Sequence, residues 1–150
     1  VVNTENAKAL GAVGMAARAS GVDIDSRFDH NDNWYTSLDV IKPFKATGDG
    51  HSRFKLRYKE IKQSMLIIKK LLKRLEEFED QSIKVNSKYC LSENSFVVSI
   101  TEAWRGEVVH CAITGKNGEL LKYKIKDPSF NNWYMLAMAV RNNGISDFPL

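Results

Sequence analysis

The chain has 150 residues, 43% hydrophobic and 27% charged, which is typical of one soluble globular domain. This composition excludes an intrinsically disordered chain, and two cysteines, Cys90 and Cys111, are too few for a disulfide scaffold. No apolar run approaches the roughly 18 residues of a membrane-spanning helix, and we identify no signal-peptide pattern. We therefore expect one domain in the reducing cytoplasm, and a start at Val1 leads us to expect a piece of a longer protein.

The net charge of +4 is unevenly distributed along the chain. Nine basic residues and a single acid, Glu60, lie between Arg53 and Arg74, and four acids follow within residues 76–80. The basic excess is therefore a property of one element and not of the whole domain.

The first fifty residues are predicted to form a helix and a long loop. Asn3-Thr4 predicts the N-cap of a helix that runs to about Ala19 and is rich in Ala, Gly and Ser. Gly11 and Gly14 would each weaken an isolated helix by roughly 1 kcal/mol, so this density of small residues indicates close approach by a neighbouring backbone. Residues 22–50, which are rich in Asp, Asn and Gly, are expected to be irregular.

The clearest element is a long amphipathic helix, predicted from about Arg53 to Glu79. It carries an apolar seam whose residues are spaced alternately by four and three positions. The seam consists of Phe54, Tyr58, Ile61, Met65, Ile68, Leu72 and Leu75. Most lysines of the segment lie off the seam, so we expect the seam to pack inside the domain.

Three strands and a last helix are predicted after residue 95. Residues 96–100 and 108–113 are apolar, β-branched runs, and Asn117-Gly118 is a strong hairpin signal. Apolar residues alternate with lysines over 121–125, which predicts a third strand with one solvated face. A C-terminal helix opens near Ser129. The predicted fold is therefore α+β: a small-residue helix, a long loop, a long helix, a three-stranded antiparallel meander and a C-terminal helix.

Metal and nucleotide sites find little support in the sequence. The three histidines are far apart, and His110 and Cys111 are neighbours on a strand, so their side chains point to opposite faces. The stretch from Gly11 to Gly14 is not a dinucleotide fingerprint. We therefore expect this chain alone to bind no metal, flavin or other cofactor.

The basic segment from Arg53 to Arg74 leaves one alternative open. A lysine-rich helix face could neutralise the phosphates of an anionic partner such as nucleic acid. However, its aromatic residues Phe54 and Tyr58 lie on the apolar side, not among the lysines. We favour a solvated lysine face over a nucleic-acid-binding module.

A set of charged residues stands beside glycines and small residues, in segments that otherwise look buried or tightly turned. The set is Arg18, Asp25, Arg27, Asp49, Glu102, Arg105 and Glu107. A buried charge needs a partner, and arginine is suited to paired hydrogen bonds with a carboxylate. We favour structural ion pairs that hold irregular loops over the alternative, a polar floor beneath a redox or ligand site.

Four stretches, in order along the chain, resemble one family of redox proteins. They are 14–21 with Asp25-Ser26-Arg27 and Asp29-His30, 48–53 with Arg57, Glu60-Ile61, Ser64 and Ile67-Ile68, 102–107, and 126–130. The family contains the large subunits of energy-converting nickel–iron hydrogenases, of the formate hydrogenlyase and hydrogenase-4 types. It also contains the related 49 kDa subunit of respiratory NADH:quinone oxidoreductase.

The resemblance implies a role for Arg105, which matches the arginine of the family's Glu-Ala-Pro-Arg-Gly motif, with Trp104 in place of the proline. That arginine would lie near a nickel–iron centre in the hydrogenases, or near a quinone cavity in the other branch. Arg18, Asp25 and Arg27 would build the wall beneath it. The chain lacks both Cys-x-x-Cys motifs of the hydrogenases, so the branch stays open.

The resemblance also implies a setting for the chain. It would be the C-terminal portion of a longer large subunit that transfers electrons beside a small iron–sulfur subunit. The assembled complex would lie at the inner face of a membrane. The isolated chain would be inactive, because it encodes no complete cofactor site.

Overall fold

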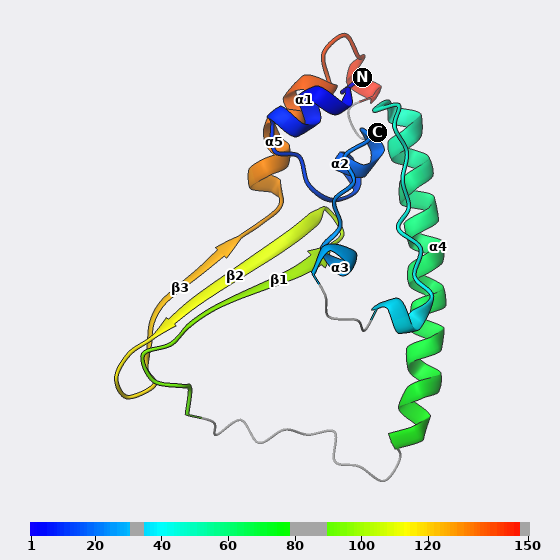
Figure 1. Ribbon diagram of the computed structural model, residues 1–150. Coiled ribbons are helices and arrows are strands. Elements are labelled where there is room, and N and C mark those ends of the chain that lie inside the picture. The colour runs from blue at the N-terminus through cyan, green and yellow to red at the C-terminus, as the bar shows by residue number, and fades with distance from the viewer. Residues whose placement is uncertain (31–34, 79–89, 148–150) are drawn as a thin grey trace.

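The computed structural model describes residues 1–30, 35–78 and 90–147. Its helices are α1 (Thr4–Ala9), α2 (Gly14–Ala19), α3 (Ser26–Asp29), α4 (Gly50–Leu75) and α5 (Ser129–Ala139), and its strands are β1 (Phe96–Ala103), β2 (Gly106–Thr114) and β3 (Leu120–Lys126). Short 3-10 helices span Tyr35–Leu38, Glu76–Phe78 and Ile145–Asp147. Helices and a three-stranded antiparallel sheet confirm the predicted α+β fold (Figure 1).

The N-terminal segment contains two helices where one was predicted. Asn3 is the N-cap as expected, and its side chain accepts a hydrogen bond from the amide of Asn6 at 2.8 Å. The prediction of a continuous helix was wrong because Gly11 and Gly14 adopt φ of +64° and +65°, which lies outside the right-handed helical region. The chain therefore turns between α1 and α2.

Residues 22–50 are largely irregular, as predicted. The exceptions are α3 and the 3-10 helix Tyr35–Leu38, and residues 31–34 lie outside the described part of the chain. Asp25 begins α3, because its side chain accepts a hydrogen bond from the amide of Arg27. The loop is thus fixed in part by its own short polar side chains.

The long helix α4 begins three residues earlier than predicted. The carboxylate of Asp49 accepts a hydrogen bond from the amide of Ser52 at 2.6 Å, which places the N-cap at Asp49. The helix ends at Leu75 and passes into a 3-10 turn at Glu76–Phe78, whereas Glu79, the predicted end, is not among the described residues. Its 26 residues span about 39 Å.

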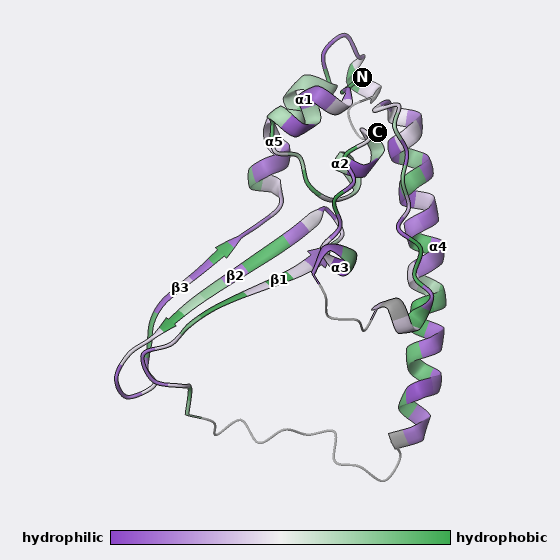
Figure 2. Ribbon diagram, in the orientation of Figure 1, coloured by the Kyte–Doolittle hydropathy of each residue, from purple (hydrophilic) through white to green (hydrophobic). Residues whose placement is uncertain are grey.

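The apolar seam of α4 does not pack inside this chain. Met65 is 59% exposed and Leu72 is 59% exposed, and the other seam residues are likewise exposed. The buried residues of the helix are Ser52, Leu56 and Glu60, a row at four-residue spacing whose N-terminal part packs near α2. The prediction of a buried seam was wrong, because the period fixes which residues share a face of the helix but not whether another part of the chain covers that face. Figure 2 shows hydrophobic residues along the length of α4, including the part that diverges from the sheet.

The strands form a meander in the order β1-β2-β3, with Val98 opposite Cys111 and Val109 opposite Lys126. Its register agrees with the predicted turns. The expected contrast between one solvated and one buried face of β3 is absent, since Leu121 and Ile125 are each 58% exposed. Figure 1 shows why: the meander and α4 approach each other beside α2 and α3 and then diverge.

The buried core is small and lies at one end of the molecule. It joins α1, α2 and α5 through Val2, Ala7, Ala12, Ala17, Met135 and Ala139. A second cluster joins α2 to α4 through Met15, Ala19 and Leu56. Alanines dominate the first cluster, so its helix backbones pack closely, as the small-residue composition indicates. No helix in the described ranges has the length and apolarity needed to cross a membrane.

Candidate functional site

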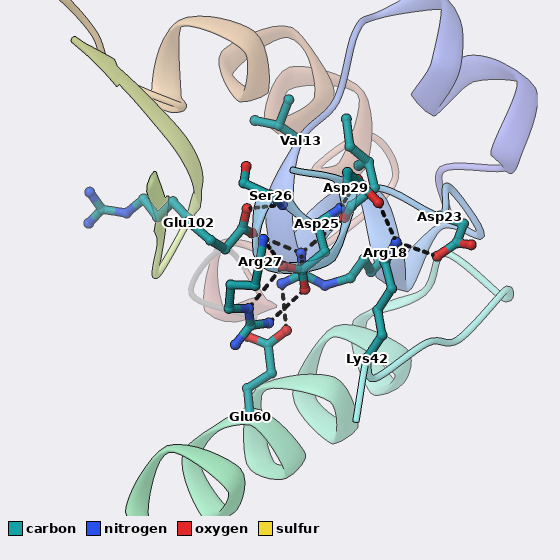
Figure 3. A network of polar contacts seen from close by, with 12 residues as sticks. Val13, Arg18, Asp23, Asp25, Ser26, Arg27, Asp29, Lys42, Glu60 and Glu102 are labelled. Atoms are coloured by element: carbon teal, nitrogen blue, oxygen red, sulfur yellow. Dashed lines mark hydrogen bonds and ion pairs between the residues drawn. The ribbon is translucent and has the colours of Figure 1, made fainter. Parts of the chain in front are cut away.

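A buried arginine connects three separate parts of the chain. Arg18 lies on α2 with its side chain 1% exposed. Its Nη2 donates to Oε1 of Glu60 on α4 at 2.6 Å, and its Nη1 donates to Oε1 of Glu102 on β1 at 2.8 Å. The same Nη1 lies 3.2 Å from Oδ2 of Asp25 and donates to the carbonyl of Ile24 (Figure 3). One guanidinium therefore bridges a helix, a strand and a loop.

Asp25 is the second centre of this network and is fully buried. Arg27 reaches back to it with two parallel hydrogen bonds, Nε to Oδ1 at 2.9 Å and Nη2 to Oδ2 at 2.6 Å. Such forked pairs combine charge with fixed geometry. The network of Arg18, Asp25, Arg27, Glu60 and Glu102, called the buried charge network below, holds two positive and three negative groups.

Within the network, the pKa values of Arg18, Asp25 and Arg27 shift in the directions that keep these three groups charged. Burial alone would raise the pKa of Asp25, but hydrogen bonds from Arg27 and the charge of Arg18 lower it further than burial raises it. Burial opposes the charge of Arg18 and Arg27 as well, yet their carboxylate partners raise the pKa of both guanidinium groups. The pairs of Asp25 with Arg18 and Arg27 are therefore ionic in the folded protein.

Glu102 ties the network to the sheet. It lies near the end of β1, and its second oxygen, Oε2, accepts a hydrogen bond from the amide of Ser26 at the start of α3 at 3.1 Å. This contact explains why α3 packs beside β1. The carboxylate therefore fixes the position of the strand end that leads into the β1–β2 turn.

Sequence reasoning did not include Glu60 among the site residues. The signal was present, because Glu60 is the single acid among the nine basic residues between Arg53 and Arg74. An isolated acid on a basic helix is more informative than another lysine, since it implies a specific cationic partner. Here the partner is Arg18.

Two of the predicted residues lie outside the network. Asp49 caps α4, and hydrogen bonds from Ser52 hold the pKa of its carboxylate below the usual value. Glu107 lies on β2 and pairs with Nζ of Lys126 at 3.3 Å. The structure therefore brings Arg18, Asp25, Arg27 and Glu102 together and leaves Asp49 and Glu107 at separate structural positions.

A second cluster, missed by sequence reasoning, borders the buried charge network. Nζ of Lys42 lies 2.9 Å from a carboxylate oxygen of Asp23 and 3.0 Å from one of Asp29. Asp29 also accepts a hydrogen bond from the amide of Asp25 at 2.6 Å. The lysine thus fastens the irregular loop to the segment around α3 (Figure 3).

Arg105 lies in the tight turn between β1 and β2. Ala103 pairs with Gly106, so Trp104 and Arg105 alone form the loop, and Gly106 has a φ of +135°. The side chain of Arg105 is exposed, while its carbonyl accepts a hydrogen bond from Nδ2 of Asn132 on α5 at 3.0 Å. The turn backbone is therefore held by a hydrogen bond, while the Arg105 residue stays exposed.

Gly14 explains how the turn can lie against α2. A Cβ on Gly14 would be 2.3 Å from the Cα of Gly106 and 2.4 Å from the carbonyl oxygen of Arg105. Only glycine permits this approach, and Gly14 also has a positive φ. The family-like motif around Arg105 is thus seated directly on the start of α2.

A cavity of about 410 Å³ opens beside this turn. Its walls come from α2, the β1–β2 turn, the N-terminal part of α4, and α5 with the residues after it. Among the described residues, Arg53, Arg57 and Arg105 line it, together with Trp104 and Trp133. We call it the arginine pocket.

The potential metal ligands are dispersed in the part of the chain that the structure describes. No group of three or more His, Cys, Asp or Glu residues there has the arrangement of a metal site. Cys90 and Cys111 are free thiols, and Nδ1 of His110 is hydrogen-bonded to the hydroxyl of Tyr123.

Comparison with curated proteins gives relatives of two kinds. The D subunit of NADH-quinone oxidoreductase from Syntrophobacter fumaroxidans is 28% identical over 98% of this chain and 39% of that protein. Formate hydrogenlyase subunit 5 from Escherichia coli is 28% identical over 99% of this chain and 26% of its own length. The alpha subunit of the membrane-bound hydrogenase of Pyrococcus furiosus is 32% identical over 98% of this chain and 37% of that subunit. The chain thus spans about a quarter to two fifths of these relatives.

A solved structure and a family profile agree with these relatives. One chain of the membrane-bound sulfane sulfur reductase, described as an archaeal respiratory membrane complex, matches with a TM-score of 0.81 and 22% identity. The match covers 99% of this chain and 41% of that chain, and it shows a shared fold. The family profile for the 49 kDa subunit of respiratory-chain NADH dehydrogenase matches residues 1–97. Since these residues are well over half of the sequence, the chain belongs to the family of the respiratory-chain NADH dehydrogenase 49 kDa subunit.

Proposed function

We propose that this chain is the C-terminal part of a large subunit that frames a redox or quinone site next to a small iron–sulfur subunit. Its complex would lie at the cytoplasmic face of a membrane, in keeping with the respiratory and membrane-bound complexes named among its relatives. The observation that carries the proposal is the position of Arg105. Its turn is fixed by Gly14, Asn132 and the buried charge network, while its guanidinium is exposed beside a cavity.

The residues of this chain do not fit a nickel–iron centre by themselves. Such a centre favours soft thiolate ligands. The chain has two cysteines, of which Cys90 is exposed and Cys111 lies within β2, and neither belongs to a cluster of metal-ligating groups in the described ranges. The proposed role of this chain therefore assigns no part of the reaction to a metal that the chain itself holds.

The polar residues fit the role of a charged wall beside a redox-active substrate. A fixed guanidinium stabilises negative charge that develops on a neighbouring oxygen, and does so without reorganisation at the moment of reaction. The buried charge network acts one layer beneath, since Glu102 holds the strand end that carries Trp104 and Arg105. Arg18, Asp25 and Arg27 are positioning residues in this proposal.

The test compares the assembled oxidoreductase with the isolated chain. Arg105→Lys replaces a planar fork by a point charge, and we expect turnover of the assembled oxidoreductase to fall by about tenfold or more, which corresponds to about 1.4 kcal/mol in the barrier. Arg105→Ala is expected to lower turnover further. Because Arg105 is exposed, the free energy of unfolding of both variants of the 150-residue chain should lie within about 0.5 kcal/mol of the parent value.

The matched control is Arg74→Lys, at the opposite end of α4 from the turn, which should change neither turnover nor melting. A large loss of stability in Arg105→Ala, with unchanged activity per folded complex, would show that the arginine is structural only. The alternative of a free-standing nucleic-acid-binding module finds no support among the relatives.

A further inference from the structure

We propose that the arginine pocket binds an aromatic ligand that carries a phosphate group. The pocket is defined by this chain's own residues, and the proposal does not depend on the redox role of Arg105. At about 410 Å³ the pocket falls within the range of small-molecule sites, roughly 300–1,000 Å³.

The first argument is the charge of the lining. Arg53 and Arg57 come from successive turns of α4 and Arg105 from the β1–β2 turn, so three arginines from two elements line one cavity. No aspartate or glutamate of the described residues lines it. A cavity bordered by fixed positive charge favours a ligand with more than one negative charge.

Two acids outside the lining interact electrostatically with these arginines. Asp49 attracts Arg53, but its carboxylate caps α4 through Ser52. Asp127 lies within electrostatic range of Arg105, and its carboxylate accepts a hydrogen bond from the amide of Ser129 at 2.8 Å. Both carboxylates keep their charge, but the three arginines of the lining outnumber them.

Arg57 supplies the second argument. Its Nε is buried and has no hydrogen-bond partner among the described residues. A buried donor without an acceptor costs about 1–3 kcal/mol. A ligand that accepts a hydrogen bond from Nε of Arg57 would remove this cost. Burial lowers the pKa of Arg53, and the neighbouring charge of Arg57 lowers it further. A bound anion would relieve this repulsion.

The third argument is the apolar part of the pocket. Trp104 and Trp133 are 50% and 64% exposed although they border a cavity, and Met15 and Leu136 line it with them. Exposed indole rings stack on planar aromatic groups, and arginine stacks on the same groups through its guanidinium plane. The pocket thus offers charge to one end of a ligand and aromatic surface to the other.

Phosphate is the anion that fits these features. It carries a charge of about −1.5 to −2 at neutral pH and has three strong acceptor oxygens. Arginine recognises it with paired hydrogen bonds. A carboxylate would bring only a single charge to three guanidinium groups.

The experiment uses calorimetric titration of the 150-residue chain with three probes. Phenyl phosphate carries both recognised groups, phenol carries the ring alone, and inorganic phosphate carries the anion alone. We expect phenyl phosphate to bind at least about tenfold more tightly than either of the others, and its affinity to fall as salt is raised. Equal binding of phenol, or of inorganic phosphate, would overturn the proposal.

Three variants locate the binding. Arg57→Gln and Arg105→Gln are each expected to weaken phenyl phosphate about tenfold or more, the loss that follows from removing a hydrogen bond to a charged group. Arg74→Gln removes the same charge from the far end of α4 and should have no effect. Since Arg105 is exposed, its variant stays informative even if Arg57→Gln fails to fold. Equal weakening by Arg74→Gln would show that phosphate meets only the general positive charge of the helix.

Discussion

Arg18 and Glu60 are 42 residues apart in sequence, yet Nη2 of the arginine lies 2.6 Å from Oε1 of the glutamate in the interior of the protein. This contact clamps α2 to α4 at the point where Leu56 packs against Met15 and Ala19. Glu102 accepts from the other terminal nitrogen of the same guanidinium, so the clamp extends to the sheet. One buried arginine therefore helps to hold the β1–β2 turn in place relative to the helices, together with Gly14 and Asn132.

Replacing Arg18 should unfold the chain or loosen it severely. Arg18→Met keeps an apolar stem of similar length but leaves Asp25, Glu60 and Glu102 without their shared cation. Breaking a buried ion pair on one side costs about 3–5 kcal/mol, because the remaining charge stays buried. Urea denaturation of the variant measures this loss.

The control for this change is Arg141→Met. Arg141 is exposed after the end of α5, so its replacement should alter the free energy of unfolding by no more than about 0.5 kcal/mol. If both variants unfold at the same urea concentration as the parent, the buried charge network makes no net contribution to stability.

Asp25 should make the stability of the chain depend on acid. Its pKa in the folded protein lies below its unfolded value of about 3.9, despite the opposing effect of burial. The stabilisation is therefore complete above about pH 4 and is lost as the pH falls through the lower, folded pKa. Urea titrations between pH 7 and pH 2.5 should show this loss in the parent.

Asp25→Asn removes the titrating group and with it part of the acid dependence. This variant should be less stable at neutral pH, because an amide cannot match the charge of Arg18 and Arg27. Its stability should also change less between pH 5 and pH 2.5 than that of the parent. Parallel profiles for the two proteins would show that other carboxylates dominate the acid response.

Local signals in the sequence were sufficient to predict several elements. Asn3 predicted an N-cap through its short acceptor side chain, and Asn117-Gly118 predicted the β2–β3 turn, where Gly118 has a φ of +73°. Apolar, β-branched runs predicted β1 and β2, and the alternation of apolar residues with lysines predicted β3. Each of these features depends on neighbours within a few residues, which is why one sequence can reveal them.

Features that depend on distant contacts could not be predicted in the same way. Gly11 and Gly14 were recognised as weak helix formers, but only the approach of Gly106 explains why the chain turns at Gly14. The seam of α4 has a clear period, yet burial depends on what lies opposite, and the described part of this chain leaves the seam exposed. The partner of Glu60 is equally non-local.

Gly14→Ala should disrupt the close contact between the start of α2 and the β1–β2 turn. The new Cβ would overlap the backbone of Gly106 and Arg105, and alanine would be strained at a φ of +65°. We expect a loss of about 2 kcal/mol or more in the free energy of unfolding. Gly115→Ala is the matched control: its Cβ would meet only the flexible end of Glu119, and the residue has no positive φ. Equal melting temperatures for the two variants would contradict the close contact between α2 and the turn.

The two faces of α4 should respond oppositely to a new charge. Leu56 is 1% exposed and packs with Met15 and Ala19, so Leu56→Asp buries an unpaired carboxylate and should cost several kcal/mol, enough to unfold a small domain. Met65 belongs to the predicted seam but is 59% exposed. The free energy of unfolding of Met65→Asp in the 150-residue chain should therefore lie within about 0.5 kcal/mol of the parent value. Both variants place the same side chain on the same helix, so helix propensity cancels between them. Thermal unfolding followed by circular dichroism measures the difference. A Met65→Asp variant that melts as early as Leu56→Asp would show that the seam is buried in solution, against the packing of α4 described above.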